Sequence, residues 1–206
     1  MISEYGSVVA ERKLPPIDEL VMTILSQNTS DVNMLRGFES LKTRFPTWEE
    51  VLAAPEELLA DTIRSSGTFR VKAKRIKASL SEIVSRVGSL DLSLLEDMEL
   101  EAARDWLTSL HGVGPKTAAI VLLFSFGRPV LPVDTHVWRV TKRIGLVSNS
   151  STREKAQIEL EQIVPGSCVY SINHNLIKHG REICRAQKPN CSSCFLKHEC
   201  EYYTSL

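Results

Sequence analysis

The sequence predicts an all-α protein. Apolar residues recur at helical spacing in almost every segment of the 206-residue chain, as they do on the buried faces of amphipathic helices. No stretch combines strict two-residue alternation with the turn residues that join strands into hairpins. Hydrophobic residues make up 43% of the chain, which is enough for one large domain or two small ones. We therefore expect a folded core built from packed helices.

The first expected helix opens at Pro16, because proline is favoured in the first turn, and it ends at the polar loop 26–31. The next helix covers residues 32–44 and is stopped by the Phe-Pro pair that follows it. Thr47 and Glu50 have the spacing of a capping box, so another short helix is expected to begin there.

The second half begins with a helix whose inward face lies within residues 100–110. The sequence His-Gly-Val-Gly at 111–114 predicts a tight hairpin, and the helix expected after it, 115–126, is apolar on nearly all sides. We expect that helix to run through the middle of the protein. Asp134 is placed to cap a further helix, which Gly145 would end.

Charge is balanced overall but not locally. Lys plus Arg and Asp plus Glu both total 25, so the net charge is zero. Residues 64–78 carry six basic residues and no acid, whereas 91–105 carry six acids and one Arg. A nucleic-acid site is therefore expected to be a local basic patch, although a solvated helix face also explains the run. The longest apolar stretch, 118–124, is far shorter than the roughly 18 residues that span a bilayer, so no membrane segment is expected.

Four of the five cysteines lie close together near the end of the sequence, at Cys184, Cys191, Cys194 and Cys200. A single C-x-x-C flanked by two isolated cysteines fits the four corners of a [4Fe-4S] cluster better than the paired ligands of zinc. A zinc site and free thiols remain as alternatives. Cys168 stands apart and is interpreted as a buried small hydrophobe without a role.

The hairpin offers two features that could carry chemistry. Gly112 and Gly114 permit a tight bend that exposes N–H groups at the start of a helix, where a phosphate can bind. A plain turn between helices would also use these glycines. Lys116 follows in the first turn, where the helix dipole and apolar neighbours would lower its pKa and make it an amine nucleophile. Alternatively, Lys116 binds a phosphate at the hairpin or is simply solvated. For Asp134 the alternative is a helix N-cap with no role in chemistry.

Three segments together resemble the endonuclease III family of helix-hairpin-helix DNA glycosylases: LHGVGPKTAAIVL, PVDTHVWRV and the four-cysteine tail. The resemblance extends from ILSQNTSD near the start to Cys200. It implies two lobes with DNA in the cleft between them. Residues 16–128 would form a helical barrel, and residues 1–15 with 129–206 would form the lobe that holds the [4Fe-4S] cluster.

The same resemblance places Lys116 on the family's catalytic lysine and Asp134 on its catalytic aspartate. It implies a bifunctional glycosylase and AP lyase that removes oxidised pyrimidines and cleaves the strand by β-elimination, with no cofactor in the chemistry. Gln27 would fill the gap left by the flipped base. Thr68 stands where a leucine wedge is common, and Phe69 or Arg70 is expected to take over that work. The expected DNA contacts are Gln27, Thr68, Phe69, Arg70, Lys72, Gly112, Val113 and Gly114.

Two alternatives remain at this point: removal of mismatched or deaminated bases on the same scaffold, and a non-catalytic DNA-binding iron-sulfur protein. A basic surface interleaved with an aromatic residue, Phe69, favours nucleic acid as the partner. We expect a monomer that acts on double-stranded DNA carrying a damaged base or an abasic site. The N-terminus has no targeting signature, so we expect a cytoplasmic, nucleoid-associated protein.

Overall fold

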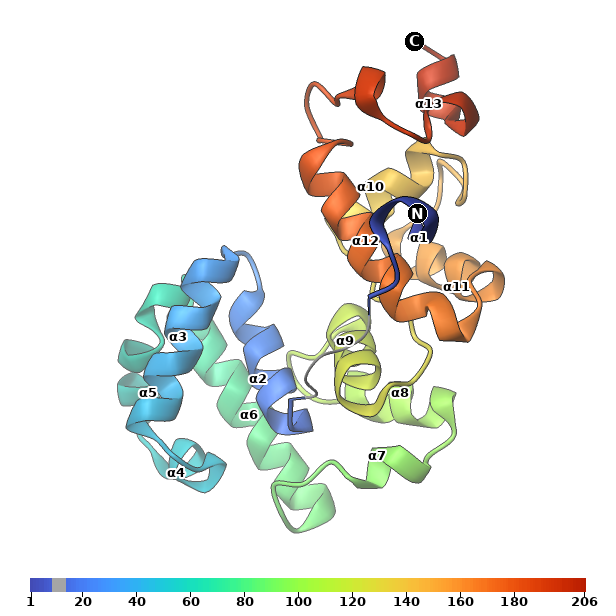
Figure 1. The fold of residues 1–206 in the computed structure, drawn as a ribbon. Coiled ribbons are helices and arrows are strands. Elements are labelled where there is room, and N and C mark those ends of the chain that lie inside the picture. Colours follow the sequence, from blue (N-terminus) through green and yellow to red (C-terminus); the bar gives the residue numbers. More distant parts are fainter. Residues whose placement is uncertain (9–13) are drawn as a thin grey trace. The chain divides into compact units, whose positions relative to one another are not determined.

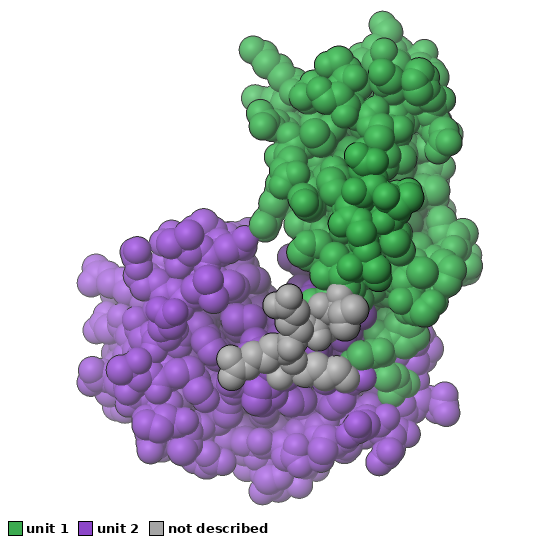
Figure 2. Space-filling model, viewed as in Figure 1, with its two compact units in different colours: residues 1–12, 127–206 green, residues 13–126 purple. Residues whose placement is uncertain are grey.

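The computed structural model describes residues 1–8 and 14–206, and these form helices and loops without a strand (Figure 1). The expectation of an all-α protein is confirmed. The chain divides into two compact units (Figure 2): unit 1 comprises residues 1–12 and 127–206, and unit 2 comprises residues 13–126. The boundaries proposed from the sequence, after residues 15 and 128, lie a few residues away. Residues 9–13, next to the first boundary, are outside the described part.

Unit 2 holds eight α-helices and one short 3-10 helix within its described residues. They are α2 (Pro16–Ser26), α3 (Asp31–Arg44), α4 (Trp48–Ala53), α5 (Glu56–Thr62), η1 (Arg64–Ser66), α6 (Phe69–Val87), α7 (Leu94–Asp97), α8 (Leu100–Thr108) and α9 (Pro115–Phe126).

Helix α9 lies at the centre of unit 2, as its sequence predicts. It packs against both α2 and α8, and six of its residues are buried: Thr117, Ala118, Ala119, Val121, Leu122 and Leu123. Helix α2 contributes a matching apolar face that includes Leu20, Ile24 and Leu25. A helix without a polar side can only be stable where neighbours cover it all round, and here the surrounding helices do so.

Side chains at the N-cap position stabilise the first turns of several helices. Ser30 accepts a hydrogen bond from Asn33 N at 3.3 Å at the start of α3. Thr47 accepts one from Glu50 N at 3.3 Å at the start of α4, as the capping-box spacing predicts. Each cap satisfies a backbone N–H that has no partner within its helix.

Unit 1 contains α1 (Ile2–Tyr5), α10 (Thr135–Arg143), α11 (Arg153–Ile163), η2 (Gly166–Cys168), α12 (Val169–Glu182), η3 (Cys191–Ser193), η4 (Lys197–Glu199) and α13 (Glu201–Thr204). Helices α10 and α12 pack closely together. A Cβ atom at Gly180 of α12 would lie 2.9 Å from His136 Cβ of α10, so this approach requires glycine.

In the described part of the chain, none of the helices combines the length and apolar character needed to cross a bilayer.

Candidate functional site

The hairpin between α8 and α9 packs tightly against α6. Gly112 has a φ of 81°, and a Cβ atom there would lie 2.8 Å from Arg75 Cγ, so the position requires glycine. Val113 is buried, and its N–H donates to Leu110 O at 3.1 Å. Contrary to the expectation of a DNA contact, Val113 offers neither its side chain nor its N–H to a phosphate. Gly114 is exposed and stays a candidate.

Lys116 lies in the first turn of α9, directly after this hairpin. Its side chain is exposed, so the expectation of apolar surroundings is wrong. The reason is geometric: α9 buries Thr117 and most of the residues after it, whereas Pro115 and Lys116 at its start are exposed. An exposed amine at this point can reach a ligand bound at the hairpin.

Two loops of unit 2 lie side by side, and each contains a residue other than glycine with a left-handed backbone conformation. The loop between α2 and α3 contains Asn28 with a φ of 52°, and the loop before α6 contains Thr68 with a φ of 38°. A Cβ atom at Gly67 would lie 4.0 Å from Thr29 Oγ1, which places the loops in contact. Left-handed backbone at a residue other than glycine is costly and concentrates at functional sites. Asn28 is exposed and was missed from the sequence, where only the tolerance of asparagine for this conformation signals it.

Lys72 was expected to contact DNA, and the structure contradicts this. Its side chain is 1% exposed, and Nζ donates to Leu25 O at 2.7 Å and to Ser66 O. Burial, with a smaller effect from the Arg75 charge, lowers the pKa of Lys72 from 10.5 to about 8. The ammonium therefore joins the two loops from inside and is not available to a phosphate.

Gln27 is half-buried, and its side chain is held within unit 2. Arg75 Nη1 donates to Gln27 Oε1 at 2.6 Å. Because the stem of Arg75 also packs against Gly112, this one side chain connects the hairpin to the loop between α2 and α3. The amide nitrogen of Gln27 is the end that remains to meet a ligand.

The basic run divides into exposed and structural residues. Arg70 and Lys74 are exposed, whereas Lys77 Nζ donates to Leu52 O at 2.7 Å and is half-buried. The guanidinium carbons of Arg64 and Arg70 both lie 5.5 Å from the centre of the Phe69 ring. A base that stacked on Phe69 would compete with these cations.

Asp134 caps α10 in unit 1, as the sequence predicts. Its Oδ1 accepts hydrogen bonds from His136 N and Val137 N, both at 2.8 Å. Oδ2 takes no part in these two hydrogen bonds. Lys116 belongs to unit 2 and Asp134 to unit 1.

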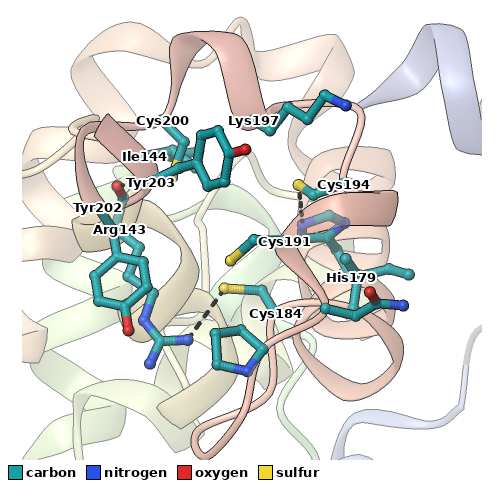
Figure 3. A pocket seen from close by; sticks show the side chains of 13 residues that line it. Arg143, Ile144, His179, Cys184, Cys191, Cys194, Lys197, Cys200, Tyr202 and Tyr203 are labelled. Atoms are coloured by element: carbon teal, nitrogen blue, oxygen red, sulfur yellow. Dashed lines mark hydrogen bonds between the residues drawn. The ribbon is translucent and has the colours of Figure 1, made fainter. Parts of the chain in front are cut away.

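The four clustered cysteines of unit 1 line one pocket together with Arg143, His179, Tyr202 and Tyr203 (Figure 3). Arg143 Nη1 donates to Cys184 Sγ at 3.4 Å, and Cys194 Sγ lies 3.5 Å from His179 Nε2. The Cys200 thiol donates to Arg143 O at 3.2 Å. Burial and the neighbouring cysteines raise the pKa of Cys194, and a hydrogen bond from the Leu196 backbone opposes them.

The spacing of these sulfur atoms distinguishes two kinds of metal site. Among residues 1–8 and 14–206, no three His, Cys, Asp or Glu side chains are grouped closely enough to hold one metal ion. A zinc ion needs four ligands about 2.3 Å from a single centre, whereas the thiolates of a [4Fe-4S] cluster bind four separate irons and stand farther apart. Either site requires cysteines that share one pocket, as these four do. Cys168 lies apart in η2 and is half-buried, not fully buried as expected.

The fold and these features define an all-helical protein with a helix-hairpin-helix and a four-cysteine pocket, and comparison with known proteins identifies its family. Residues 21–166 match the HhH-GPD superfamily of base excision DNA repair proteins, and the chain belongs to this family. Endonuclease III of Thermotoga maritima is 36% identical, covering 98% of this chain and 93% of that protein. Endonuclease III of Rickettsia felis is 40% identical, covering 90% of this chain and 83% of the relative.

Solved structures lead to the same family. A non-covalent endonuclease III–DNA complex has a TM-score of 0.84 and 30% identity, covering 99% of this chain and 92% of the solved one. A trapped endonuclease III–DNA covalent intermediate has a TM-score of 0.83 at the same identity and coverage. The resemblance to the endonuclease III family noted from the sequence is thereby confirmed.

Proposed function

We propose that the chain removes oxidised pyrimidines from duplex DNA and then cleaves the strand, with Lys116 as the nucleophile and Asp134 as the assisting carboxylate. Its family makes it a base-excision-repair DNA glycosylase and lyase. The observation that carries the residue assignment is the exposed Lys116 amine in the first turn of α9, directly behind the hairpin.

The chemistry needs one amine and one carboxylate. The neutral Lys116 amine forms a bond from Nζ to C1′ of the sugar as the glycosidic bond breaks, and the base leaves with the bonding electron pair and takes up the proton that the attacking nitrogen releases. Asp134, through Oδ2, stabilises the positive charge that develops on the sugar. Ring opening gives an imine between Nζ and C1′. Loss of a C2′ proton then expels the 3′ phosphate, and water hydrolyses the imine and releases the amine.

The DNA contacts proposed for unit 2 are Gln27, Thr68, Phe69, Arg70, Gly112 and Gly114. Lys72 and Val113 are omitted because both are buried. Asn28 is added because it is exposed, has left-handed backbone and lies beside Gln27. Residues 13–126 would form the barrel lobe and the remainder the cluster lobe. The enzyme would act as a monomer on damaged duplex in the nucleoid of the cytoplasm.

A [4Fe-4S] cluster is the proposed cofactor, held by Cys184, Cys191, Cys194 and Cys200. The single C-x-x-C flanked by two isolated cysteines, with all four sulfurs lining one pocket, supports this choice over zinc. When bound, the cofactor supplies iron–thiolate bonds that cross-link the tail, and base removal uses none of its chemistry. Arg143 supports the same region by donating to Arg185 O at 2.7 Å and Ala186 O at 3.1 Å.

Borohydride trapping on duplexes with one defined lesion tests the proposal. The wild-type protein should give a covalent complex on a thymine glycol duplex, and Lys116→Ala should give none. Lys155→Ala, which removes another exposed amine, should trap like the wild type. Undiminished trapping by Lys116→Ala would exclude Lys116 as the nucleophile. Trapping confined to mismatched or deaminated bases would favour the alternative specificity.

A further inference from the structure

Unit 1 has a second hollow that the proposed chemistry does not use. It offers about 360 Å³ of space and is called here the cationic hollow. Its lining includes four basic side chains, Arg139, Lys142, Arg143 and Arg153, and one aromatic ring, Trp138. Thr135 and Asn149 complete the lining, so no acidic residue contributes to it.

Two of the four cations are fixed by main-chain carbonyls. Arg139 donates from Nε to Cys184 O at 3.0 Å and from Nη2 to Gly180 O at 2.8 Å. Arg143 is held in the same way by two carbonyls after Cys184. Carbonyl oxygens satisfy the donors of a guanidinium and leave its charge in place, although Arg143 also donates to Cys184 Sγ and so directs part of its charge toward the cysteine pocket. These two side chains therefore form a rigid positive wall.

The other two cations each lie against Trp138. Lys142 Nζ lies 4.5 Å and Arg153 Cζ lies 5.6 Å from the centre of a Trp138 ring. The indole is fixed because Nε1 donates to Ser151 O at 2.9 Å. Cation–π attraction thus holds both positive charges next to one fixed indole.

The ion pairs found in the described residues involve Lys42, Arg86 and Arg104. None of the four cations of the hollow makes an ion pair there. Glu154 follows Arg153 and its charge interacts with that of Arg153, but Glu154 does not line the hollow. The positive charge of the hollow is therefore available to a ligand.

The chemistry of the ligand follows from these groups. Two cations already lie over the Trp138 ring, so a stacked nucleobase is disfavoured. Lysine and arginine together suit the oxygens of a phosphate. We propose that the cationic hollow binds a phosphate of the DNA backbone outside the lesion, as a second anchor on unit 1. That the phosphate belongs to DNA rests on the proposed function. That the ligand is a phosphate rests only on the four basic side chains of the hollow.

The test replaces the two cations that lie over Trp138. Each phosphate contact contributes about 0.9 to the slope of log affinity against log salt. Because the hollow would hold one phosphate, the double variant Lys142→Gln/Arg153→Gln should lower that slope by about one unit on an undamaged duplex of about 30 base pairs. Lys155→Gln, a neighbouring exposed lysine on α11, should leave the slope unchanged. An unchanged slope in the double variant would overturn the proposal.

Two control measurements separate a loss of charge from a change in packing or in catalysis. Lys142→Arg/Arg153→Lys keeps both charges and should retain the wild-type slope, and a loss equal to that of the glutamine pair would indicate a packing effect instead of charge. The trapping rate at saturating enzyme should be unchanged in the glutamine double variant. If the wild type binds DNA through the hollow but never traps a lesion, the proposed function fails while this inference stands.

A free polyphosphate could use the same chemistry. Inorganic tripolyphosphate should change Trp138 fluorescence weakly at millimolar concentration, and a duplex should suppress that change by competition. Tight tripolyphosphate binding that persists with saturating DNA, together with an unchanged salt slope, would assign the hollow to a free ligand and overturn the DNA proposal.

Discussion

The ammonium of Lys72 donates a hydrogen bond of 2.7 Å to the carbonyl oxygen of Leu25. The same nitrogen also binds Ser66 O, so one buried side chain joins the end of α2 to the end of η1. Both of these segments lead into loops with left-handed backbone, at Asn28 and Thr68. The cation holds the two loops together without a carboxylate among these contacts.

Lys72→Met should reduce the free energy of unfolding by about 1–3 kcal/mol at pH 7, because two buried carbonyls lose their partner. The lowered pKa of Lys72, about 8 instead of 10.5, adds a pH dependence. Between these pH values the unfolded wild-type chain binds more protons than the folded one. The free energy of unfolding of the wild type should therefore increase relative to that of the variant as pH rises from about 8 to 10.5. Urea unfolding at pH 7.5, 9 and 10 measures this difference, and a constant difference would contradict it.

Glu19→Gln should stabilise the protein at pH 8 and have little effect near pH 4.5. Burial raises the pKa of Glu19 to about 7, against a smaller opposing effect from the Thr23 hydroxyl. The folded state therefore holds a proton that the unfolded state releases between pH 4.5 and 7, and stability falls as pH rises through that window. Glutamine keeps the neutral form at all pH values. Thermal melting at pH 4.5, 6 and 8 tests this; a destabilised variant at pH 8 would count against it.

Asp134→Asn should separate catalysis from capping. Asparagine is as good an N-cap as aspartate, so α10 and the melting temperature should be nearly unchanged. Base removal should fall by about 10²–10³-fold, because the neutral amide no longer stabilises the sugar cation. Single-turnover rates with excess enzyme measure the loss. Asp134→Ala provides the comparison, since it should lose both activity and about 1 kcal/mol of stability. Equal rates for Asp134→Asn and the wild type would restrict this residue to the cap.

The purified protein should contain about four irons and absorb broadly near 400 nm, as expected for iron–thiolate charge transfer. Cys191→Ser should lower the iron content and destabilise unit 1, because one corner of the cluster loses its ligand. Cys168→Ser should change neither property, since Cys168 lies outside the pocket. Iron analysis and thermal melting give the readouts. One zinc per chain in a colourless protein would refute the cluster.

Arg70→Gln/Lys74→Gln should flatten the salt dependence of duplex binding by up to about two units, if both exposed cations contact phosphate. Arg36→Gln, an exposed change on α3, serves as the control and should not alter the slope. Fluorescence anisotropy at several salt concentrations measures it. A slope equal to that of the wild type would make this part of α6 a solvated surface.

Local signals in the sequence determined much of this protein. Helical periodicity gave the all-α class, and the apolar sequence of 115–126 correctly predicted a central helix. Capping by Thr47 and Asp134 was also predictable, because a cap depends on residues within a few positions of each other. The spacing of the four cysteines indicated a shared pocket, since a short segment limits how far apart they can lie.

Only the tertiary structure decided which residues of the basic run face solvent. Lys72 and Lys74 are equivalent by composition, yet one is buried beneath two loops and the other is exposed. Exposure depends on which face of α6 meets segments far away in the sequence. The link from Arg75 to Gln27 and the placement of Arg153 of α11 against Trp138 of α10 arise in the same way. Such contacts depend on how helices pack, and a linear pattern carries no record of that packing.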